Sequence, residues 1–493
     1  MNNNYSLLKK ICLILGPAIA IVFSFFVNIE GLAPIGCKAI GLTLWMVIWW
    51  VSDCMPLWIT SLLPVAGSII LGIAGKSAGT HTLLDGTEVK IEVYSNYAAS
   101  VVLMCIGVFV IAAVIERWNL HKRIALSIVS LAGDRPFLII MAFGIATGFI
   151  SMFISNTTAA AMMLPIALAM VKQFEMKMDN PFAKALVINT VFAAASGGMG
   201  TMIGSGTNIS AVGLIYEMTG LEFTFVEWMK IGFPLVVFIV PLGAVVCYFV
   251  CGVKGTSLGD ASFIKKELKS LGKMNRGEVT SLIYLVVAIL AFFFRAQIAE
   301  AVPFLSMLSD DGLGILLGVI AFVIPINFKE GVFLMDSKYA MSKISWSTYL
   351  LLGGALQLGS IFKAAGVSAW IGEKLVFLEG MPTIVVILII AVIASVISEV
   401  VSNFVVVAAF MPVMYSLSLT LGLNPLILMM TVTLAASFSY ALPSSTPPIA
   451  LAFSTGYVEM KDMIKTGFAL KFVACILFPV IMYLISMPLS PLF

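Results

Sequence analysis

Charged residues are scarce in this sequence of 493 residues, because aspartate, glutamate, lysine and arginine together make up only 11% of it. A soluble domain usually contains about 25% charged residues. Hydrophobic residues account for 61% of the chain, and the mean hydropathy is +1.09. Too few charges are present to cover a water-facing surface, so the sequence predicts a protein surrounded by lipid. The net charge of +3 gives no indication of a nucleic-acid partner.

Residues that usually carry catalysis or bind metals are also rare. Only two histidines are present, and the seven cysteines lie in or beside apolar runs without metal-ligand or redox spacing. Such thiols usually behave as small hydrophobic side chains. Paired carboxylates and nucleophile–base arrangements are also missing from the sequence. We therefore expect neither an enzyme nor a resident cofactor.

Long apolar runs are abundant, and runs of about 18 residues or more predict transmembrane helices. We expect about eleven spans, at residues 11–28, 36–53, 56–75, 98–120, 183–216, 230–252, 279–297, 312–328, 346–370, 424–455 and 466–488. Two further apolar segments, 136–173 and 382–419, are too long for one crossing and contain polar residues in their middle. Each is expected to form a re-entrant hairpin of two half-length helices inside an all-α polytopic membrane protein.

The loops between these spans differ in charge. With the N-terminus inside, lysine and arginine collect in the inner segments, at residues 122–135, 172–184, 254–276, 329–343 and 461–465. Glutamate and aspartate collect in the outer segments 217–227 and 310–311. The positive-inside rule therefore favours an inside N-terminus, and the odd number of spans places the C-terminus outside. We expect the protein to lie in a bacterial cytoplasmic membrane. The first hairpin would open to the cytoplasm and the second to the exterior.

Two parts of the sequence resemble each other. Residues 155–165, which begin with Ser-Asn and end with proline, match residues 402–412 at an offset of 247 positions (402 − 155). Gly107 and Gly354 have the same offset. Further matches join 194–196 to 435–437 and 230–233 to 465–468, at offsets of 241 and 235. Because the matching hairpins face opposite sides, we expect an inverted repeat, an arrangement that recurs in secondary transporters.

Each repeat contains two polar interruptions. The first is the Ser-Asn pair at the hairpin middle, and the second lies in the next helix, at residues 204–208 and 444–448. Glycine and proline in these segments break the helix and free backbone groups. Helix N-termini attract anions, whereas freed carbonyls and side-chain oxygens coordinate small cations such as sodium. These interruptions therefore predict a site for an anion and a coupling cation.

Glu399 stands three residues before Ser402 and is a third unusual feature. A carboxylate within a membrane segment is a functional candidate by default. We expect it to contact the substrate or ion directly, to pair with Lys363, or to hold the structure of the hairpin. Its counterpart in the first repeat is Met152, so the repeat gives it no support.

With these motifs in view, the chain resembles the divalent anion/sodium symporter family, also called the dicarboxylate transporter family. The motifs that carry the resemblance are Ser155-Asn156-Thr157, Ser402-Asn403-Phe404, Thr446-Pro447-Pro448 and Phe453-Ser454-Thr455-Gly456-Tyr457. The resemblance covers nearly the whole chain. It implies an elevator-type homodimer in the lipid bilayer, in which a scaffold part holds the dimer and a transport part carries the site across.

The resemblance also implies roles for individual residues. Substrate carboxylates would contact Ser155, Asn156, Thr157, Ser402, Asn403, Thr446 and Pro447. One sodium site would use Ser151, Ser155, Asn156 and Gly204, and a second would use Ser398, Val401, Asn403 and Ser445. Three departures occur: Phe404 and Ser398 replace threonines, and residues 205–207 replace a frequent Thr-Pro-Pro. Both sodium symport and anion exchange therefore remain open.

The repeat and the resemblance together predict a division of the chain. Residues 1–97 and 279–345 would be scaffold helices, residues 98–252 and 346–493 the two repeats, and residues 253–278 a cytoplasmic linker. The expected cargo is a small organic dianion or trianion of the succinate, malate, 2-oxoglutarate or citrate class. The alternative is sulfate or another oxyanion carried by the same fold. A channel would be excluded by saturable uptake and countertransport.

Overall fold

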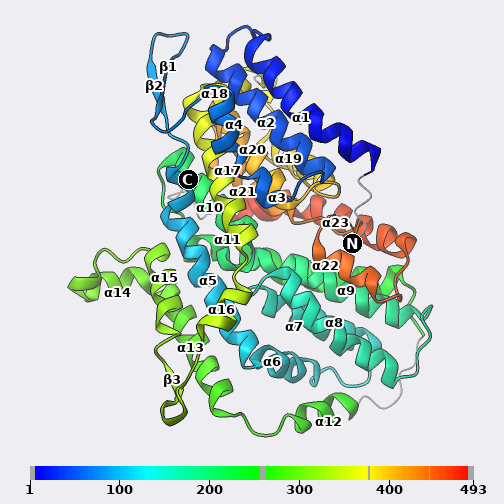
Figure 1. The fold of residues 1–493 in the computed structure, drawn as a ribbon. Coiled ribbons are helices and arrows are strands. Elements are labelled where there is room, and N and C mark those ends of the chain that lie inside the picture. Colours follow the sequence, from blue (N-terminus) through cyan, green and yellow to red (C-terminus); the bar gives the residue numbers. More distant parts are fainter. Residues whose placement is uncertain (1–5, 256–261, 376–377, 444, 487–493) are drawn as a thin grey trace.

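A computed structural model of the chain describes residues 6–255, 262–375, 378–443 and 445–486, and these parts are almost entirely helical (Figure 1). The N-terminal part contains α1 (Leu7–Phe25), α2 (Pro34–Ser52), α3 (Leu57–Thr60), α4 (Leu63–Ile70), β1 (Gly79–Thr82) and β2 (Glu88–Ile91). The next part contains η1 (Ser95–Ala98), α5 (Ser100–Arg117), α6 (Leu120–Val129), α7 (Pro136–Ser151), α8 (Asn156–Gln173), α9 (Pro181–Gly197), η2 (Gly198–Gly200), η3 (Met202–Gly204), α10 (Gly206–Thr219) and α11 (Phe225–Val250).

The second half of the chain is also helical. Its central part contains α12 (Ser262–Ser270), α13 (Arg276–Phe293), α14 (Arg295–Ala301), η4 (Pro303–Leu305), α15 (Asp310–Ile320), β3 (Pro325–Asn327), η5 (Phe328–Glu330), β4 (Val332–Phe333) and α16 (Ser337–Lys343). Its last part contains α17 (Trp346–Ala364), α18 (Val367–Lys374), α19 (Thr383–Ile397), α20 (Asn403–Thr420), α21 (Pro425–Ala436), α22 (Pro447–Ser454) and α23 (Met460–Ser486). In the described parts of the chain, the strands form two small antiparallel hairpins, β1–β2 and β3–β4.

The polytopic helical architecture expected from the sequence is confirmed. Among the described residues, eight helices are long and apolar enough to cross a membrane: α1, α2, α5, α9, α11, α13, α20 and α23. The pair α17 and α18 makes a ninth if it is counted as one span. The expected last span, 466–488, lies in α23 except for residues 487 and 488, which fall outside the described residues.

Besides the spans 183–216 and 424–455, whose breaks the sequence predicts, other expected spans also depart from a straight continuous helix. The segment 56–75 forms the short helices α3 and α4, and Pro56 and Pro64 stand at their starts. The segment 346–370 bends by 72° between α17 and α18, where Gly366 adopts a φ of 73°. The segment 312–328 is helical only as far as Ile320, where α15 ends after 11 residues. Hydropathy alone recognises an apolar run but does not show where its helix turns.

The two polar-interrupted segments do form helical hairpins, but their arms are longer than expected. In the first hairpin α7 has 16 residues and α8 has 18, and in the second α19 has 15 and α20 has 18. At about 1.5 Å per residue, an arm of this size reaches roughly 23–27 Å rather than half a membrane. Both arms of the first hairpin pack against α9, and both arms of the second pack against α21.

Helices α5–α11 and α17–α23 pack in matching ways, as the internal repeat in the sequence predicts. The contacts of α9 with α7 and α8 correspond to those of α21 with α19 and α20, and the contact of α7 with α11 corresponds to that of α19 with α23. The matched glycines also behave alike. A Cβ atom on Gly107 would collide with the backbone of Gly314, and one on Gly354 would collide with Ser61. Each glycine therefore permits a close helix contact.

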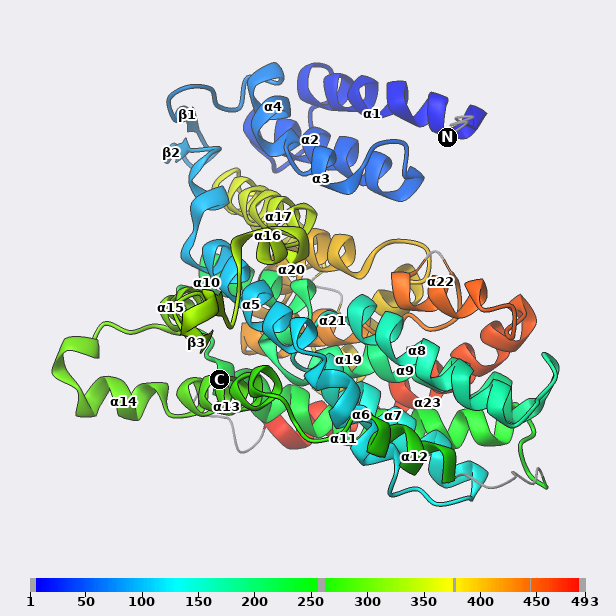
Figure 2. The ribbon, with the colours of Figure 1, turned by 60° about the horizontal axis from the view of Figure 1, so that its bottom comes forward.

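The arrangement of the helices places the polar interruptions deep in the protein. Helices α1–α4 form a group at one edge, and α8, α9, α22 and α23 lie near one another in a separate part of the protein (Figure 2). Among the candidate spans α9 is the most enclosed, with 94% of its window buried inside the protein. The break that follows α9 is therefore surrounded by protein, as irregular backbone in a membrane requires.

Candidate functional site

The turn of the first hairpin is organised by Ser155, which caps the N-terminus of α8. Its hydroxyl accepts a hydrogen bond from the Thr158 amide at 3.3 Å, and Asn156 is the first residue of the helix. The serine stops the chain from continuing as helix from α7, because its φ and ψ of −59° and 144° are not helical. The first amide groups of a helix have no partner inside the helix, so those at the start of α8 can bind an acceptor.

Beside this turn lies a cluster of oxygen atoms that contains more hydrogen-bond acceptors than donors. The Ser151 hydroxyl is 3.0 Å from Asn156 Oδ1 and 2.6 Å from the Ala194 carbonyl, so one proton serves two acceptors. The Asn156 amide nitrogen donates to the Ala195 carbonyl at 3.4 Å. Ser151 is completely buried. The cluster therefore offers oxygen atoms to a cation without a formally charged ligand.

The break between α9 and α10 completes this side of the site. A Cβ atom on Gly204 would lie 2.6 Å from the Gly198 carbonyl oxygen and 3.0 Å from that of Met152, so these groups meet closely. The Asn208 side chain donates to the carbonyls of Gly198 and Thr201, at 2.7 and 2.8 Å. Its own Oδ1 is buried and has no hydrogen-bond partner among the described residues. Our site prediction did not include Asn208, although it ends the polar stretch 204–208.

The second hairpin repeats the first in outline but uses different partners. Ser402 caps α20 without a side-chain hydrogen bond, and Asn403 Oδ1 accepts from the Ser439 hydroxyl at 2.9 Å. Two residues expected in the second sodium site, Ser398 and Ser445, donate to carbonyls near them, at 3.1 and 2.6 Å. Val401, the fourth residue of this predicted site beside Asn403, is buried. The oxygen lone pairs of both serines remain available.

The break between α21 and α22 ends in the expected Thr446-Pro447 turn. Thr446 is the N-cap of α22 and Pro447 is its first residue, a position that suits proline because its missing N–H would be unpaired there. The Thr446 hydroxyl is buried without a hydrogen-bond partner among the described residues. Ser444, which belongs to the predicted break, lies outside those residues. This hydroxyl is a polar group at a helix N-terminus that a ligand can satisfy.

The two repeats interlock around these breaks. Helix α10 of the first repeat packs against α20 and α21, and α22 of the second packs against α8 and α9. The Ser196 hydroxyl is 2.8 Å from the Tyr440 hydroxyl, which joins the end of α9 to the break between α21 and α22. The rings of Phe192 and Tyr440 are 5.1 Å apart. The four polar interruptions therefore belong to one connected region.

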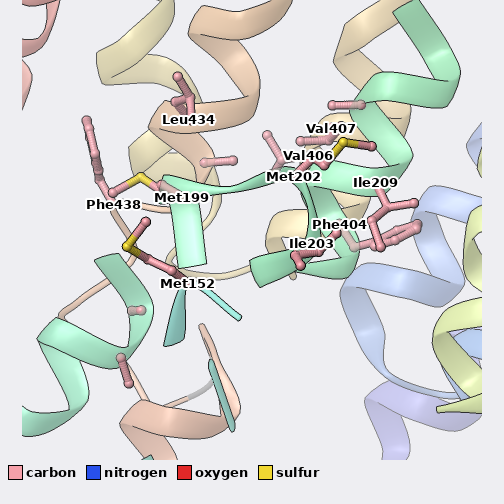
Figure 3. Close-up of a cluster of buried hydrophobic side chains, with 14 of the residues drawn as sticks. Met152, Met199, Met202, Ile203, Ile209, Phe404, Val406, Val407, Leu434 and Phe438 are labelled. Atoms are coloured by element: carbon pink, nitrogen blue, oxygen red, sulfur yellow. The ribbon is translucent and has the colours of Figure 1, made fainter. Parts of the chain in front are cut away.

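Phe404, which stands where a threonine was expected, contributes apolar packing. Only 6% of it is exposed. Figure 3 draws Phe404 in the same buried cluster as Ile203 and Ile209 from the first repeat. Met152, Met199 and Phe438 belong to this cluster as well. The side chain thus joins α20 to the break before α10 instead of supplying a hydroxyl group.

A cavity of about 370 Å³ opens beside the first hairpin turn. It is lined on one side by Ser155, Thr157, Thr158 and Gly206, and on the other by Glu116, Lys343, Ser345 and Thr348. Lys343 forms an ion pair with Glu116, and this hydrogen bond raises the pKa of Lys343 above its ordinary value. Asn156 and the predicted residues of the second repeat do not line this cavity. It therefore reaches only the first half of the predicted site.

Glu399 does not pair with Lys363, which was one of three possibilities from the sequence. Lys363 instead donates to the carbonyls of Glu217 and Met218, at 2.8 and 3.1 Å. The partner of Glu399 is Lys471 on α23, at 2.6 Å. Sequence reasoning missed Lys471 because it is 72 positions away (471 − 399) and has an apolar counterpart, Val236, in the first repeat.

Comparison with known proteins gives one family match, two relatives and one solved structure. Residues 7–491 match the family described as the sodium:sulfate symporter transmembrane region. The chain is 31% identical to a sodium-dependent dicarboxylate transporter, SdcS, of Staphylococcus saprophyticus, over 99% of this chain and 93% of the relative. The Staphylococcus aureus (strain USA300) protein of the same name is also 31% identical, over 96% of this chain and 91% of the relative. The crystal structure of the Alcanivorax borkumensis YdaH transporter has a TM-score of 0.53 at 12% identity, covering 91% of this chain and 98% of that chain.

Proposed function

Because this chain belongs to the sodium:sulfate symporter family of integral membrane proteins, we propose that it is a secondary active transporter that carries dicarboxylates with sodium. The dicarboxylate class is supported by the relatives, whose names describe sodium-dependent dicarboxylate transporters. The observation that carries the sodium dependence is the oxygen cluster at Ser151 and Asn156. An uncharged ligand set suits a cation whose charge is balanced by an anion bound nearby.

We propose that the substrate carboxylates bind at the helix N-termini of the two hairpins and the two breaks. Their contacts would come from Ser155, Asn156, Thr157, Ser402, Asn403, Thr446 and Pro447. The first sodium ion would use Ser151, Ser155, Asn156 and Gly204, and the second Ser398, Val401, Asn403 and Ser445. Free amide groups and the positive end of each helix dipole favour a carboxylate at these positions.

The mechanism we propose is an elevator movement in a homodimer. The hairpins and the broken helices, within residues 98–252 and 346–493, would form the moving part, and residues 1–97 and 279–345 would hold the dimer. The interlocked packing of α10 with α20 and of α22 with α8 supports a single moving body. The N-terminus would lie inside and the C-terminus outside, as the loop charges favour. In that orientation the cavity with Lys343 opens toward the cytoplasm.

Uptake into proteoliposomes tests this function. Purified protein is reconstituted with an inward sodium gradient, with choline in place of sodium, or with dicarboxylate inside the vesicles and no sodium. A symporter is expected to accumulate succinate only with the sodium gradient. Accumulation that needs internal dicarboxylate and ignores sodium would instead establish anion exchange. Vesicles without protein give the background.

The family description also names sulfate, so sulfate is the second candidate cargo. Competition separates the two. Excess unlabelled succinate is expected to block the uptake of labelled succinate, whereas the same concentration of sulfate leaves it unchanged. The opposite pattern, with labelled sulfate taken up and succinate without effect, would assign the protein to inorganic oxyanions.

Gly198→Ala is expected to reduce uptake strongly, because the new Cβ atom would collide with Asn156 Oδ1. Displacing this amide removes hydrogen bonds to a charged ligand, each worth about 1.5–3 kcal/mol, which corresponds to roughly a tenfold to hundredfold loss of affinity. Gly243→Ala is the matched control, since its Cβ atom would have 3.4 Å to Asn189 Oδ1 and 3.7 Å to Leu470. Equal uptake by both variants would show that Asn156 is not part of the substrate site.

A further inference from the structure

We infer that Glu399 and Lys471 are positioning residues that fix the spacing between the two substrate-binding segments of the second repeat. This inference rests on the proposed function. Both side chains are buried, with 3% and 4% of the residues exposed, and Glu399 Oε1 is 2.6 Å from Lys471 Nζ. The lysine also donates to the Ser395 carbonyl at 2.7 Å. The pair thus ties α23 to the end of α19 beside the hairpin turn.

The carboxylate also holds the break that leads to the Thr446 turn. Glu399 Oε1 accepts from the amides of Tyr440 and Ala441, at 2.9 and 3.1 Å. Its Oε2 accepts from the amides of Ala441 and Leu442, at 3.0 and 2.9 Å. Three consecutive peptide groups are therefore gathered by one carboxylate. Such hydrogen bonds to an ionised acceptor are among the strong ones in proteins.

This arrangement joins the groups that we propose bind the substrate. Glu399 belongs to the hairpin turn, four residues before Asn403 (403 − 399). The peptide groups that it holds directly follow Ser439, whose hydroxyl donates to Asn403 at 2.9 Å, and they lead to the Thr446 turn. Moving the carboxylate therefore shifts Asn403 and Thr446 relative to each other. Their separation determines which length of dicarboxylate fits.

The first repeat shows that the fold itself does not need this ion pair. The offsets of 247 and 235 place Met152 and Val236 at the corresponding positions, and both are buried and apolar. The same helix contacts form there, between α7, α9 and α11. Burying two charges is costly, and apolar residues at such positions are often as stable or more stable. Because the first repeat packs its helices without charges at these positions, packing does not explain Glu399 and Lys471. Their role in positioning the substrate-binding segments does.

The test measures selectivity between succinate, with four carbons, and glutarate, with five. One methylene is discriminated by roughly 10- to 200-fold in a pocket shaped for one length. The variant Glu399→Gln keeps the shape but leaves one oxygen acceptor for three amides, and Glu399→Asp keeps the charge but is one methylene shorter. Both are expected to lower the ratio of succinate to glutarate affinity by about tenfold. The affinities are measured by binding to purified full-length protein in saturating sodium.

Two further variants keep the test decisive. The double variant Glu399→Gln, Lys471→Met buries no unpaired charge, so it is expected to fold even if the Glu399→Gln protein does not fold. The same loss of selectivity is expected for it. Glu278→Gln is the control, because it breaks the partly buried Arg123–Glu278 ion pair, 3.1 Å long, away from the proposed site. It is expected to lower the melting temperature without changing the ratio.

The outcomes separate the inference from the proposed function. If the wild-type protein binds succinate with sodium but the Glu399 variants and the double variant keep its selectivity, the positioning role is wrong and the pair only stabilises the fold. If Glu399→Asp alone keeps the wild-type ratio, the charge matters and the position does not, which also overturns the inference. If the wild-type protein binds neither dicarboxylate, the proposed function fails first.

Discussion

Asn156→Ala and Asn403→Ala are each expected to abolish most succinate uptake while the protein still folds and assembles. Both amides stand at the first position of a hairpin helix, and each is held by a serine hydroxyl, from Ser151 and Ser439. Each substitution removes a ligand that we propose is shared by the substrate and a sodium ion. Losing hydrogen bonds to charged groups, at about 1.5–3 kcal/mol each, lowers affinity by roughly tenfold to a hundredfold per bond.

Asn189→Ala provides the control for these variants. Asn189 is another asparagine of the first repeat and is fully buried, whereas Asn156 and Asn403 are half-buried. Its side chain donates to the Ile140 carbonyl at 2.8 Å and supports packing. A membrane hydrogen bond of this kind contributes about 0.6 kcal/mol on average. Its loss is expected to lower the melting temperature and leave substrate affinity unchanged. If Asn156→Ala and Asn403→Ala behave in the same way, the two hairpin asparagines are packing residues and the site lies elsewhere.

Sodium is expected to raise succinate affinity by about 5- to 150-fold, the usual range for coupled sites. The oxygen cluster around Ser151 offers more acceptors than protons. A sodium ion there would bind before the anion, relieve the crowded oxygens and attract a carboxylate to the start of α8. By thermodynamic linkage, succinate must raise sodium affinity by the same factor. Succinate binding to purified protein in sodium and in choline measures the effect.

The variant Ser151→Ala connects this coupling to the cluster. It removes one oxygen and is expected to shift the sodium dependence of succinate binding to higher sodium concentration, with the affinity in saturating sodium largely retained. Equal succinate affinity in sodium and choline for the wild-type protein would disprove symport. The protein would then be an exchanger that needs anion on both sides of the membrane. In it, the oxygen atoms of the cluster would hydrogen-bond to one another.

Much of the fold was predictable because its interruptions are local in sequence. Ser155 and Ser402 stop one helix and start the next, and proline or glycine marks the second break, so the sequence itself contains these signals. The repeat was recognisable because the polar residues kept their spacing. Helix ends were harder to predict, since the bend at Gly366 lies inside an apolar run and depends on one residue with positive φ. The structure adds the 72° change in direction that hydropathy cannot show.

The parts of the site that sequence could not provide are contacts between distant segments. Lys471 meets Glu399, and Tyr440 meets Ser196, only after the second repeat has folded against the first. Asn208 was visible as a polar residue, but its unpaired Oδ1 is a property of its buried surroundings. In the sequence, Phe404 indicated only that a threonine hydroxyl group is missing. The structure shows that its side chain packs beside Ile203. Such roles depend on which neighbours the fold supplies.

The Glu399–Lys471 pair and the uncharged residues around it have an electrical consequence. Every proposed contact to cargo is a hydroxyl, an amide or a peptide group, and the ion pair behind them sums to zero charge. The empty moving part therefore carries no net charge from this site through the membrane field. Membrane potential acts only on the loaded step, at about 2.3 kcal/mol per elementary charge for each 100 mV. The net charge moved then depends only on how many sodium ions accompany each succinate dianion. That number decides whether an inside-negative membrane potential drives import or leaves it unaffected.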